Sequence, residues 1–343
     1  MSIIRNTGTA LIAVAALALT ASCSREAQPP ETGSTPAAGQ RAASNAGFKI
    51  AMMPKVVGIE YFNAVRSGAE EAAKELGGTL TWDGPVTPDV TKQIEMLDAW
   101  IARRPDVIAV SANDPNALAQ TLKKARERGI VVLTYDSDST PDSRDYFINQ
   151  ATAESIGHTL VDEMAEQIGG EGEVAIVTGA LTATNQNIWM EWMRKRIAEK
   201  YPNMKIVDLK PSEEDQQLAV QVTQDLLKAY PDLKGIFAIT SVAFPGAAQA
   251  VKQAGKSGQV AVVGLATPNA MKPYVEDGTV KTVILWNPVD LGYLTVQTAK
   301  LLLSGDRKLT ETLTASRLGD VQVSGTEVLL GPPMKFNKEN IAQ

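Results

Sequence analysis

Cysteine and histidine are almost absent from this sequence. Its 343 residues include one of each, Cys23 and His158. A single cysteine excludes a disulfide within the chain, and a single histidine argues against a histidine-rich metal site or a Ser-His-Asp triad with a spare histidine. His158 lies in the polar helical pattern ESIGHTLVDEM, so we expect an ordinary surface or half-buried residue.

An excess of positive charge is also missing. Lysine and arginine total 33 against 39 aspartates and glutamates, for a formal net charge of −6. This balance gives no reason to expect a nucleic-acid-binding surface, which would need clustered basic residues. The composition, 44% hydrophobic and 21% charged, is that of a globular protein long enough for two domains.

The apolar run at residues 9–21, TALIAVAALALTA, is too short to span a bilayer comfortably. Arg5 precedes it, which is the pattern of an export signal. Thr20-Ala21-Ser22-Cys23 follows and resembles a lipobox, so we predict a lipoprotein-type signal segment at 1–23 with an acylated Cys23. A plain signal peptide with an incidental cysteine is the alternative. Residues 24–46 are rich in Pro, Ser, Gly and Ala and are predicted to be a flexible linker.

From Phe48 onward, strands and helices alternate. Strands such as DVIAV and GIVVLTY are continuous apolar runs, which is typical of a parallel sheet covered on both faces. The pattern begins again with a helix at 153–168 and the strand EVAIVTG. We therefore predict an α/β protein with two doubly wound parallel-sheet lobes. Such sheets bind ligands at the carboxyl ends of their strands, and two facing lobes form a cleft.

Polar side chains follow several of these strands, and aromatic residues lie near them. An ionised Asp accepts hydroxyl hydrogen bonds, Asn and Gln both donate and accept, and Lys donates. With an aromatic surface for C–H groups, this set suits a small polyhydroxylated ligand. The polar residues are Lys55, Asp136, Asn185, Gln186, Ser241 and Asn287, and the aromatic ones are Tyr61, Phe62, Trp189, Phe244 and Trp286.

Each of these residues also has a purely structural interpretation. Lys55 could be solvated, Asp136 could cap a turn, Asn185 and Gln186 could cap a helix, and Trp286 could be core. For Ser241 and Asn287 as well, both a structural and a ligand-binding interpretation stay open. Asp138 is expected to fix its own loop and not to touch a ligand.

Metal and catalytic interpretations are weaker. Asp136, Asp138 and Thr140 have the spacing of the first calcium-loop ligands, but Pro141 and Phe147 stand where Gly and Glu are required. Hydrolysis of a glycoside would need a second carboxylate, and no acid stands in the matching loop of the second lobe. The P-loop-like stretch at 250–257 ends a helix instead of entering one. We expect no metal, no cofactor and no catalytic residue.

Several stretches resemble bacterial ABC-transporter solute-binding proteins of the ribose-binding type, which are type I periplasmic binding proteins. The similarity is to the branch that holds the autoinducer-2-binding protein of the Lsr uptake system and the rhamnose-binding proteins, and it runs from Phe48 to the C-terminus. The stretches are AMMPKVVGIEYF, VLTYDSDSTPDSRDYFINQ, ALTATNQNIW, FPGAAQAV, TPNAMKPYVEDGTVK, LWNPVDLG and FNKENI.

The autoinducer-2 binder uses a Lys after the first strand, an Asp in a Tyr-Asp-Ser-Asp segment, an Asp-Gln pair, and later a Pro and an Ala. Lys55, Asp136 and Gln186 match, whereas Asn185, Ile239 and Ser241 differ. Rhamnose, another aldose or a polyol therefore stays open beside autoinducer-2. The resemblance and the strand-end pattern together predict a ligand site of Lys55, Phe62, Asp136, Asn185, Gln186, Ile239, Ser241, Trp286 and Asn287.

The resemblance further implies a hinge crossed three times, which we place near Asn149, Asn287 and Ser316. The N-terminal lobe would comprise 47–149 and 288–315, and the C-terminal lobe 150–287 and 316–343. It also implies a monomer in the periplasm or at the cell surface that closes on a sugar-like ligand and delivers it to an ABC permease, with membrane contact through the lipid anchor. A ligand-presenting sensory subunit for a transmembrane receptor, or a sugar-modifying enzyme, is the alternative.

Overall fold

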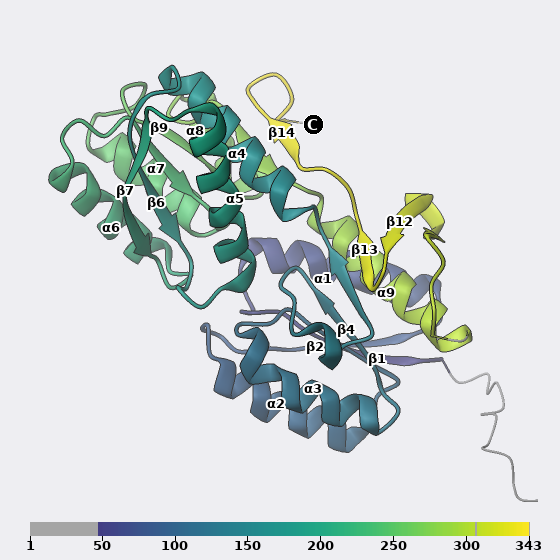
Figure 1. The fold of residues 1–343 in the computed structure, drawn as a ribbon. Coiled ribbons are helices and arrows are strands. Elements are labelled where there is room, and N and C mark those ends of the chain that lie inside the picture. Colours follow the sequence, from purple (N-terminus) through teal and green to yellow (C-terminus); the bar gives the residue numbers. More distant parts are fainter. Residues whose placement is uncertain (1–46, 306, 343) are drawn as a thin grey trace, which may run out of the picture. The chain divides into compact units, whose positions relative to one another are not determined.

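The computed structural model describes residues 47–305 and 307–342. The predicted signal segment, linker and acylation site at Cys23 lie outside these residues. The described residues fall within one compact unit, Asn45–Gln343, which contains two sheets (Figure 1). No helix within the described ranges is long and apolar enough to cross a membrane.

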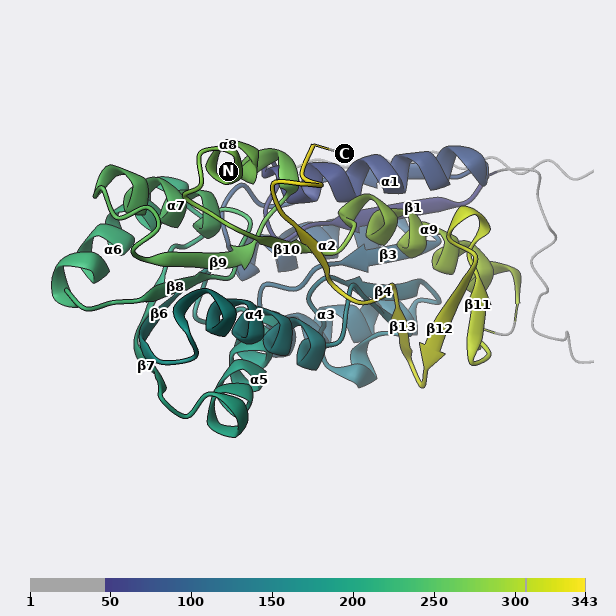
Figure 2. The same cartoon turned by 90° about the horizontal axis from the view of Figure 1, so that it is seen from above.

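In the described residues, the sheet of the N-terminal lobe has eight strands. The central strands are parallel, as predicted, while β11, β12 and β13 pair antiparallel at one edge (Figure 2). In spatial order the strands are β11 (Thr312–Thr314), β12 (Asp320–Ser324), β13 (Glu327–Leu329), β5 (Tyr146–Asn149), β4 (Val131–Tyr135), β3 (Val107–Val110), β1 (Lys49–Met53) and β2 (Thr79–Trp82).

Helices cover both faces of this sheet, which is why its central strands are apolar throughout. Ile50 and Met52 of β1 face one core, and Ala51 and Met53 face the other. The first core lies under α1 (Glu60–Glu75) and α9 (Pro288–Ser304), and the second under α2 (Val90–Arg103) and α3 (Pro115–Glu127) (Figure 1). A short 3-10 helix, η1 (Pro141–Ser143), precedes β5, and another, η2 (Ser316–Leu318), precedes β12.

The C-terminal lobe is built in the same way around a sheet that has six strands in the described residues. Its strands, in spatial order, are β14 (Met334–Phe336), β10 (Val283–Leu285), β9 (Ala261–Leu265), β8 (Gly235–Ala238), β6 (Gly172–Thr178) and β7 (Met204–Pro211). Its helices are α4 (Ala153–Ile168), α5 (Thr184–Lys200), α6 (Gln216–Ala229), α7 (Ala243–Gln253) and α8 (Pro268–Glu276). The predicted fold class of two doubly wound lobes is confirmed.

Within residues 47–305 and 307–342, the chain passes between the two sheets three times. It leaves the first sheet after β5 and returns between β10 and α9. The third passage was predicted near Ser316, and this prediction is wrong. β13 pairs parallel with β5, Glu327 opposite Phe147, so residues through Leu329 extend the first sheet. The crossing lies between Leu329 and Met334, where β14 joins β10 in antiparallel pairing.

Candidate functional site

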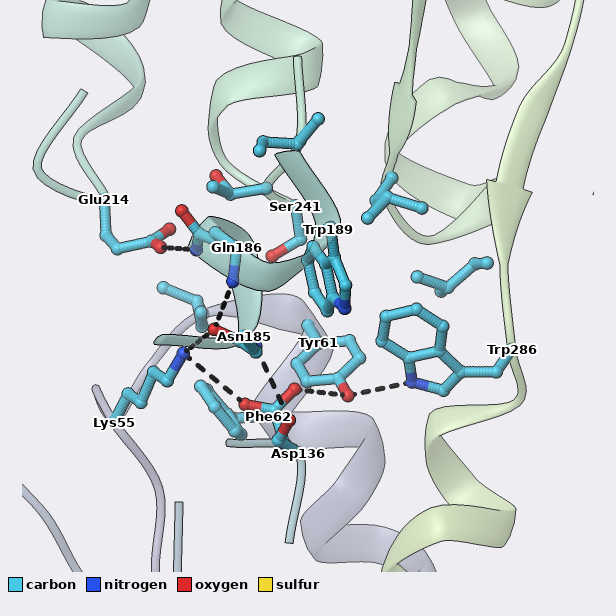
Figure 3. Close-up of a pocket in the computed structure, with 15 residues that line it drawn as sticks. Lys55, Tyr61, Phe62, Asp136, Asn185, Gln186, Trp189, Glu214, Ser241 and Trp286 are labelled. Atoms are coloured by element: carbon cyan, nitrogen blue, oxygen red, sulfur yellow. Dashed lines mark hydrogen bonds and ion pairs between the residues drawn. The ribbon is translucent and has the colours of Figure 1, made fainter. Parts of the chain in front are cut away.

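A cavity lies between the lobes, where the carboxyl ends of strands from both sheets meet (Figure 3). It contains about 410 Å³ of empty space, counting its open mouth. Eight of the nine predicted ligand residues line it, and Asn287 does not. The lining residues are Lys55, Ile59, Tyr61, Phe62, Asp136, Asn185, Gln186, Trp189, Glu214, Ile239, Thr240, Ser241, Leu265, Leu285 and Trp286.

Asp136 follows β4 with its backbone in the left-handed region, at φ 60°. Such a conformation is uncommon for a residue with a side chain and is often found at functional sites. Ser111 Oγ donates to Asp136 Oδ2 at 2.7 Å, and Tyr61 OH donates to Oδ1 at 3.0 Å. Trp286 Nε1 donates in turn to Tyr61 OH at 2.9 Å. These bonds hold the carboxylate in one orientation and leave it able to accept further hydroxyl groups.

Lys55 follows β1 and is buried, with 6% of its surface exposed. Its Nζ donates to Asn185 Oδ1 at 2.7 Å and lies 3.9 Å from Asp136 Oδ2. Burial lowers the pKa of Lys55, while the nearby charges of Asp136 and Glu214 act in the opposite direction. Asn185 Nδ2 also donates to the Asp136 backbone oxygen at 3.5 Å. Lys55 and Asn185 thus connect the lobes across the cavity.

Asn185 and Gln186 lie in the first turn of α5 and do not cap it, because the N-cap position belongs to Ala183. Gln186 Oε1 accepts hydrogen bonds from Thr178 Oγ1 at 2.5 Å and Gly179 N at 2.8 Å. These bonds fix the direction of the amide, and Gln186 Nε2 then donates to Glu214 Oε1 at 3.3 Å.

Glu214 is a second carboxylate in the cavity. It comes from the loop after β7 and not from the loop of Asn185 and Gln186, where the sequence shows no acid. Acids at this point of the sequence would suit the start of a helix, but α6 begins at Gln216. Glu213 and Glu214 instead form a turn after β7, at φ 50° and 55°. Desolvation raises the pKa of Glu214, and Lys55 opposes that shift. The position after a strand, which identified Asp136, would also have identified Glu214. Thr240 was missed as well.

Asn287 and Phe244, two residues singled out in the sequence, have structural roles. Asn287 caps α9: its Oδ1 accepts from Val289 N at 3.0 Å and its Nδ2 donates to Asp290 Oδ2 at 2.7 Å. Phe244 is fully buried in the core of the C-terminal lobe. Asp138 fixes its loop as expected, because both of its oxygens accept from Arg144 at 2.7 Å.

Aromatic rings form one wall of the cavity. Tyr61 lies edge-on to Phe62 at 5.0 Å between ring centroids and to Trp286 at 6.0 Å. The ring centroid of Trp189, in α5, lies 5.9 Å from that of Trp286. These rings come from both lobes and give the cavity apolar surface beside its polar groups, a combination typical of small-molecule sites. The described residues include no cluster of acidic, histidine or cysteine side chains arranged to hold a metal ion.

A family profile described as a periplasmic binding protein domain matches residues 50–307. The chain belongs to this periplasmic binding protein family. The resemblance seen in the sequence is therefore confirmed at the level of the family. Among curated relatives of this periplasmic binding protein is the D-ribose/D-allose-binding protein of Pseudomonas aeruginosa. The two are 29% identical over 270 residues, which cover 75% of this chain and 82% of the relative.

Two solved structures are similar throughout the folded part. One is an ABC transporter solute-binding protein from Clostridium phytofermentas with bound L-rhamnose, at 30% identity and a TM-score of 0.83, covering 86% of this chain and 97% of that one. The other is LsrB from Clostridium saccharobutylicum in complex with AI-2, at 27% identity and a TM-score of 0.81, covering 86% and 98%. Both structures share the two-lobed fold with this chain.

Proposed function

We propose that this protein is the solute-binding component of an ABC importer and that it binds a small sugar or sugar-like molecule between its lobes. The observation that carries the proposal is the composition of the cavity, in which hydroxyl-binding groups from both lobes surround an aromatic wall. Lys55 and Asp136 belong to one lobe, and Asn185, Gln186 and Ser241 to the other. A ligand that contacts residues of both lobes binds the closed arrangement more tightly than an open one and therefore favours closure.

The relatives support the same class of ligand. Their names and complexes refer to ribose and allose, to L-rhamnose and to AI-2. We propose L-rhamnose, another aldose or autoinducer-2 as candidates. Asn185, Ile239 and Ser241 differ from the residues of the autoinducer-2 binder, and they change the hydrogen-bonding character of one side of the cavity.

The proposed location is outside the cytoplasm, with Cys23 acylated and residues 24–46 acting as the tether. The receiving partner would be a membrane permease of the ABC type. The periplasmic binding protein family and the lipobox-like segment support this assignment.

A thermal-melting screen tests the proposal. The purified protein is melted with monosaccharides, polyols and autoinducer-2, and each ligand that raises the melting temperature is measured by calorimetry. A ligand at 100 times its dissociation constant adds about 2.7 kcal/mol to the free energy of unfolding. Binding without turnover supports the proposal. Chemical conversion of a bound sugar would contradict it, because Asp136 and Glu214 would then act as catalytic carboxylates.

A further inference from the structure

The cavity holds an unequal number of positive and negative groups. Fifteen residues line it, all in the described part of the chain. Two of them carry carboxyl groups, Asp136 and Glu214, and one carries a basic side chain, Lys55 (Figure 3). Lys55 lies 3.9 Å from Asp136, which leaves the charge of Glu214 without an equal counterpart. The formal charge of the cavity is therefore −1 when all three groups are ionised.

The backbone is built to bring Glu214 to this position. Ser212 N donates to Thr178 O at 2.8 Å, and Glu213 N donates to Gly179 O at 3.1 Å, so the turn is attached to the end of β6. Two successive residues other than glycine in the left-handed region are uncommon. Gly179 leaves the space that the carboxylate uses, because a Cβ at that residue would lie 2.2 Å from Glu214 Oε1.

The ionised carboxylate of Glu214 lowers the free energy of unfolding. Desolvation raises the pKa of Glu214, which means that folding favours its protonated form. A residue whose charge opposes folding, held by a turn that is itself strained, points to a use in binding.

We infer that the cavity selects neutral polyhydroxylated ligands and rejects anionic sugars such as aldonates, uronates and sugar phosphates, with Glu214 as the selecting residue. This inference rests on the proposed function. A monoanion such as an aldonate or uronate would change the formal charge of the cavity from −1 to −2, and a sugar phosphate would make it still more negative. Repulsion between like charges is poorly screened there, away from bulk water. A ligand hydroxyl, by contrast, donates a hydrogen bond to Glu214.

The helix N-termini at the cavity do not reverse this preference. The first turns of α1, α5 and α7 begin beside it and carry partial positive charge, which by itself favours anions. Gln186 Nε2, in the first turn of α5, donates to Glu214 Oε1 at 3.3 Å, so a carboxylate of the protein already lies at this helix end. An anionic ligand would add a further negative charge beside it.

The test compares neutral sugars with anionic counterparts. D-Ribose is paired with D-ribose 5-phosphate and D-ribonate, and L-rhamnose with L-rhamnonate. D-Arabinose is paired with D-arabinonate, and binding to each compound is measured by calorimetry. The variants are Glu214→Gln and, as a matched control, Glu213→Gln. Glu213 is exposed, shares the left-handed backbone and carries the same charge, but it does not line the cavity.

We expect the wild-type protein to bind a neutral sugar at least about 100-fold more tightly than its anionic counterpart. Glu214→Gln should narrow this ratio by at least about tenfold, while Glu213→Gln leaves it unchanged. Glu214→Gln should also raise the melting temperature of the ligand-free protein at pH 7, because the amide resembles the protonated form that folding favours.

An anionic sugar bound as tightly as its neutral parent would overturn the inference while leaving the proposed function intact. The same holds if Glu213→Gln changes the ratio as much as Glu214→Gln, since selection would then come from the overall charge of the surface. Failure to bind any sugar, neutral or anionic, would overturn the proposed function and the inference with it. A lower melting temperature for Glu214→Gln would show that the carboxylate serves the fold.

Discussion

Lys55 Nζ donates a hydrogen bond to Asn185 Oδ1 at 2.7 Å, and this bond joins the loop after β1 in one lobe to the first turn of α5 in the other. Because each residue also contacts Asp136, the pair links lobe closure to the group that we propose binds ligand hydroxyls.

A double-mutant cycle at this pair measures the link. Lys55→Met and Asn185→Ala should each weaken ligand binding, because either change removes the bond between the lobes. The double variant should lose less binding free energy than the sum of the two single losses, with a coupling of about 1.5–3 kcal/mol for a charge-assisted hydrogen bond. Calorimetry of the four proteins gives the coupling. Additive losses would show that the two residues act independently.

Asp136→Asn should weaken binding by at least about 100-fold, because hydrogen bonds to a charged acceptor contribute about 1.5–3 kcal/mol each. Asparagine tolerates the left-handed backbone at this residue, so the fold should survive. Asp142→Asn, an exposed acid in the same loop region, is the control. Unchanged affinity in Asp136→Asn, or an equal loss in the control, would refute the role of Asp136.

Gly292→Ala should destabilise the N-terminal lobe by about 1–3 kcal/mol, since the new Cβ would lie 1.9 Å from Val65 O in α1. Gly305→Ala, just past the end of α9, is the matched control because the nearest atom to its new Cβ is 3.7 Å away. Urea unfolding measures both variants. Equal stability of the two would show that α1 and α9 can separate without loss.

The ion pair between Asp162 and Arg196 predicts a dependence of stability on pH. Arg196 donates to both oxygens of Asp162, at 2.8 and 2.6 Å, and these hydrogen bonds lower the pKa of Asp162 below its usual value in the folded protein. The stability that the pair contributes is present above the unfolded pKa and is lost as the pH falls through the folded one.

Asp162→Asn should therefore lower the melting temperature at pH 7 by about 1–3 °C, a small effect because the pair is partly exposed. The difference from wild type should shrink below pH 4, where the native carboxylate also becomes protonated. A difference that stays constant from pH 7 to pH 3 would contradict the assignment.

The architecture was predictable because strands that are covered by helices on both faces of a sheet consist of continuous apolar residues. VIAV at 107–110 and IVVL at 130–133 are apolar at every position, and Asp136 stands out as an acid just after the second run. The edge strands were harder to assign. β12 alternates exposed and buried residues, and its sequence does not indicate which sheet it joins, so the third crossing was misplaced.

Residues that line the cavity were predictable where they directly follow a strand, because the carboxyl ends of the strands meet at the cavity. Glu214 was hidden because two acids before a helical pattern suggest a helix start, and the left-handed turn that redirects them has no glycine to reveal it. The sequence around Asn287 was ambiguous for a different reason. An Asn before a Pro at the start of a helix suits both a cap and a ligand contact, and the structure uses it as a cap.

We propose that the cavity between the lobes binds a small neutral sugar. Calorimetric titration of the purified protein with L-rhamnose, D-ribose, D-arabinose and autoinducer-2, repeated on Asp136→Asn, tests it most directly. We expect saturable one-to-one binding of at least one of these compounds, weakened at least about 100-fold in Asp136→Asn. Unchanged affinity in Asp136→Asn, or the absence of binding to all four compounds, would contradict the proposal.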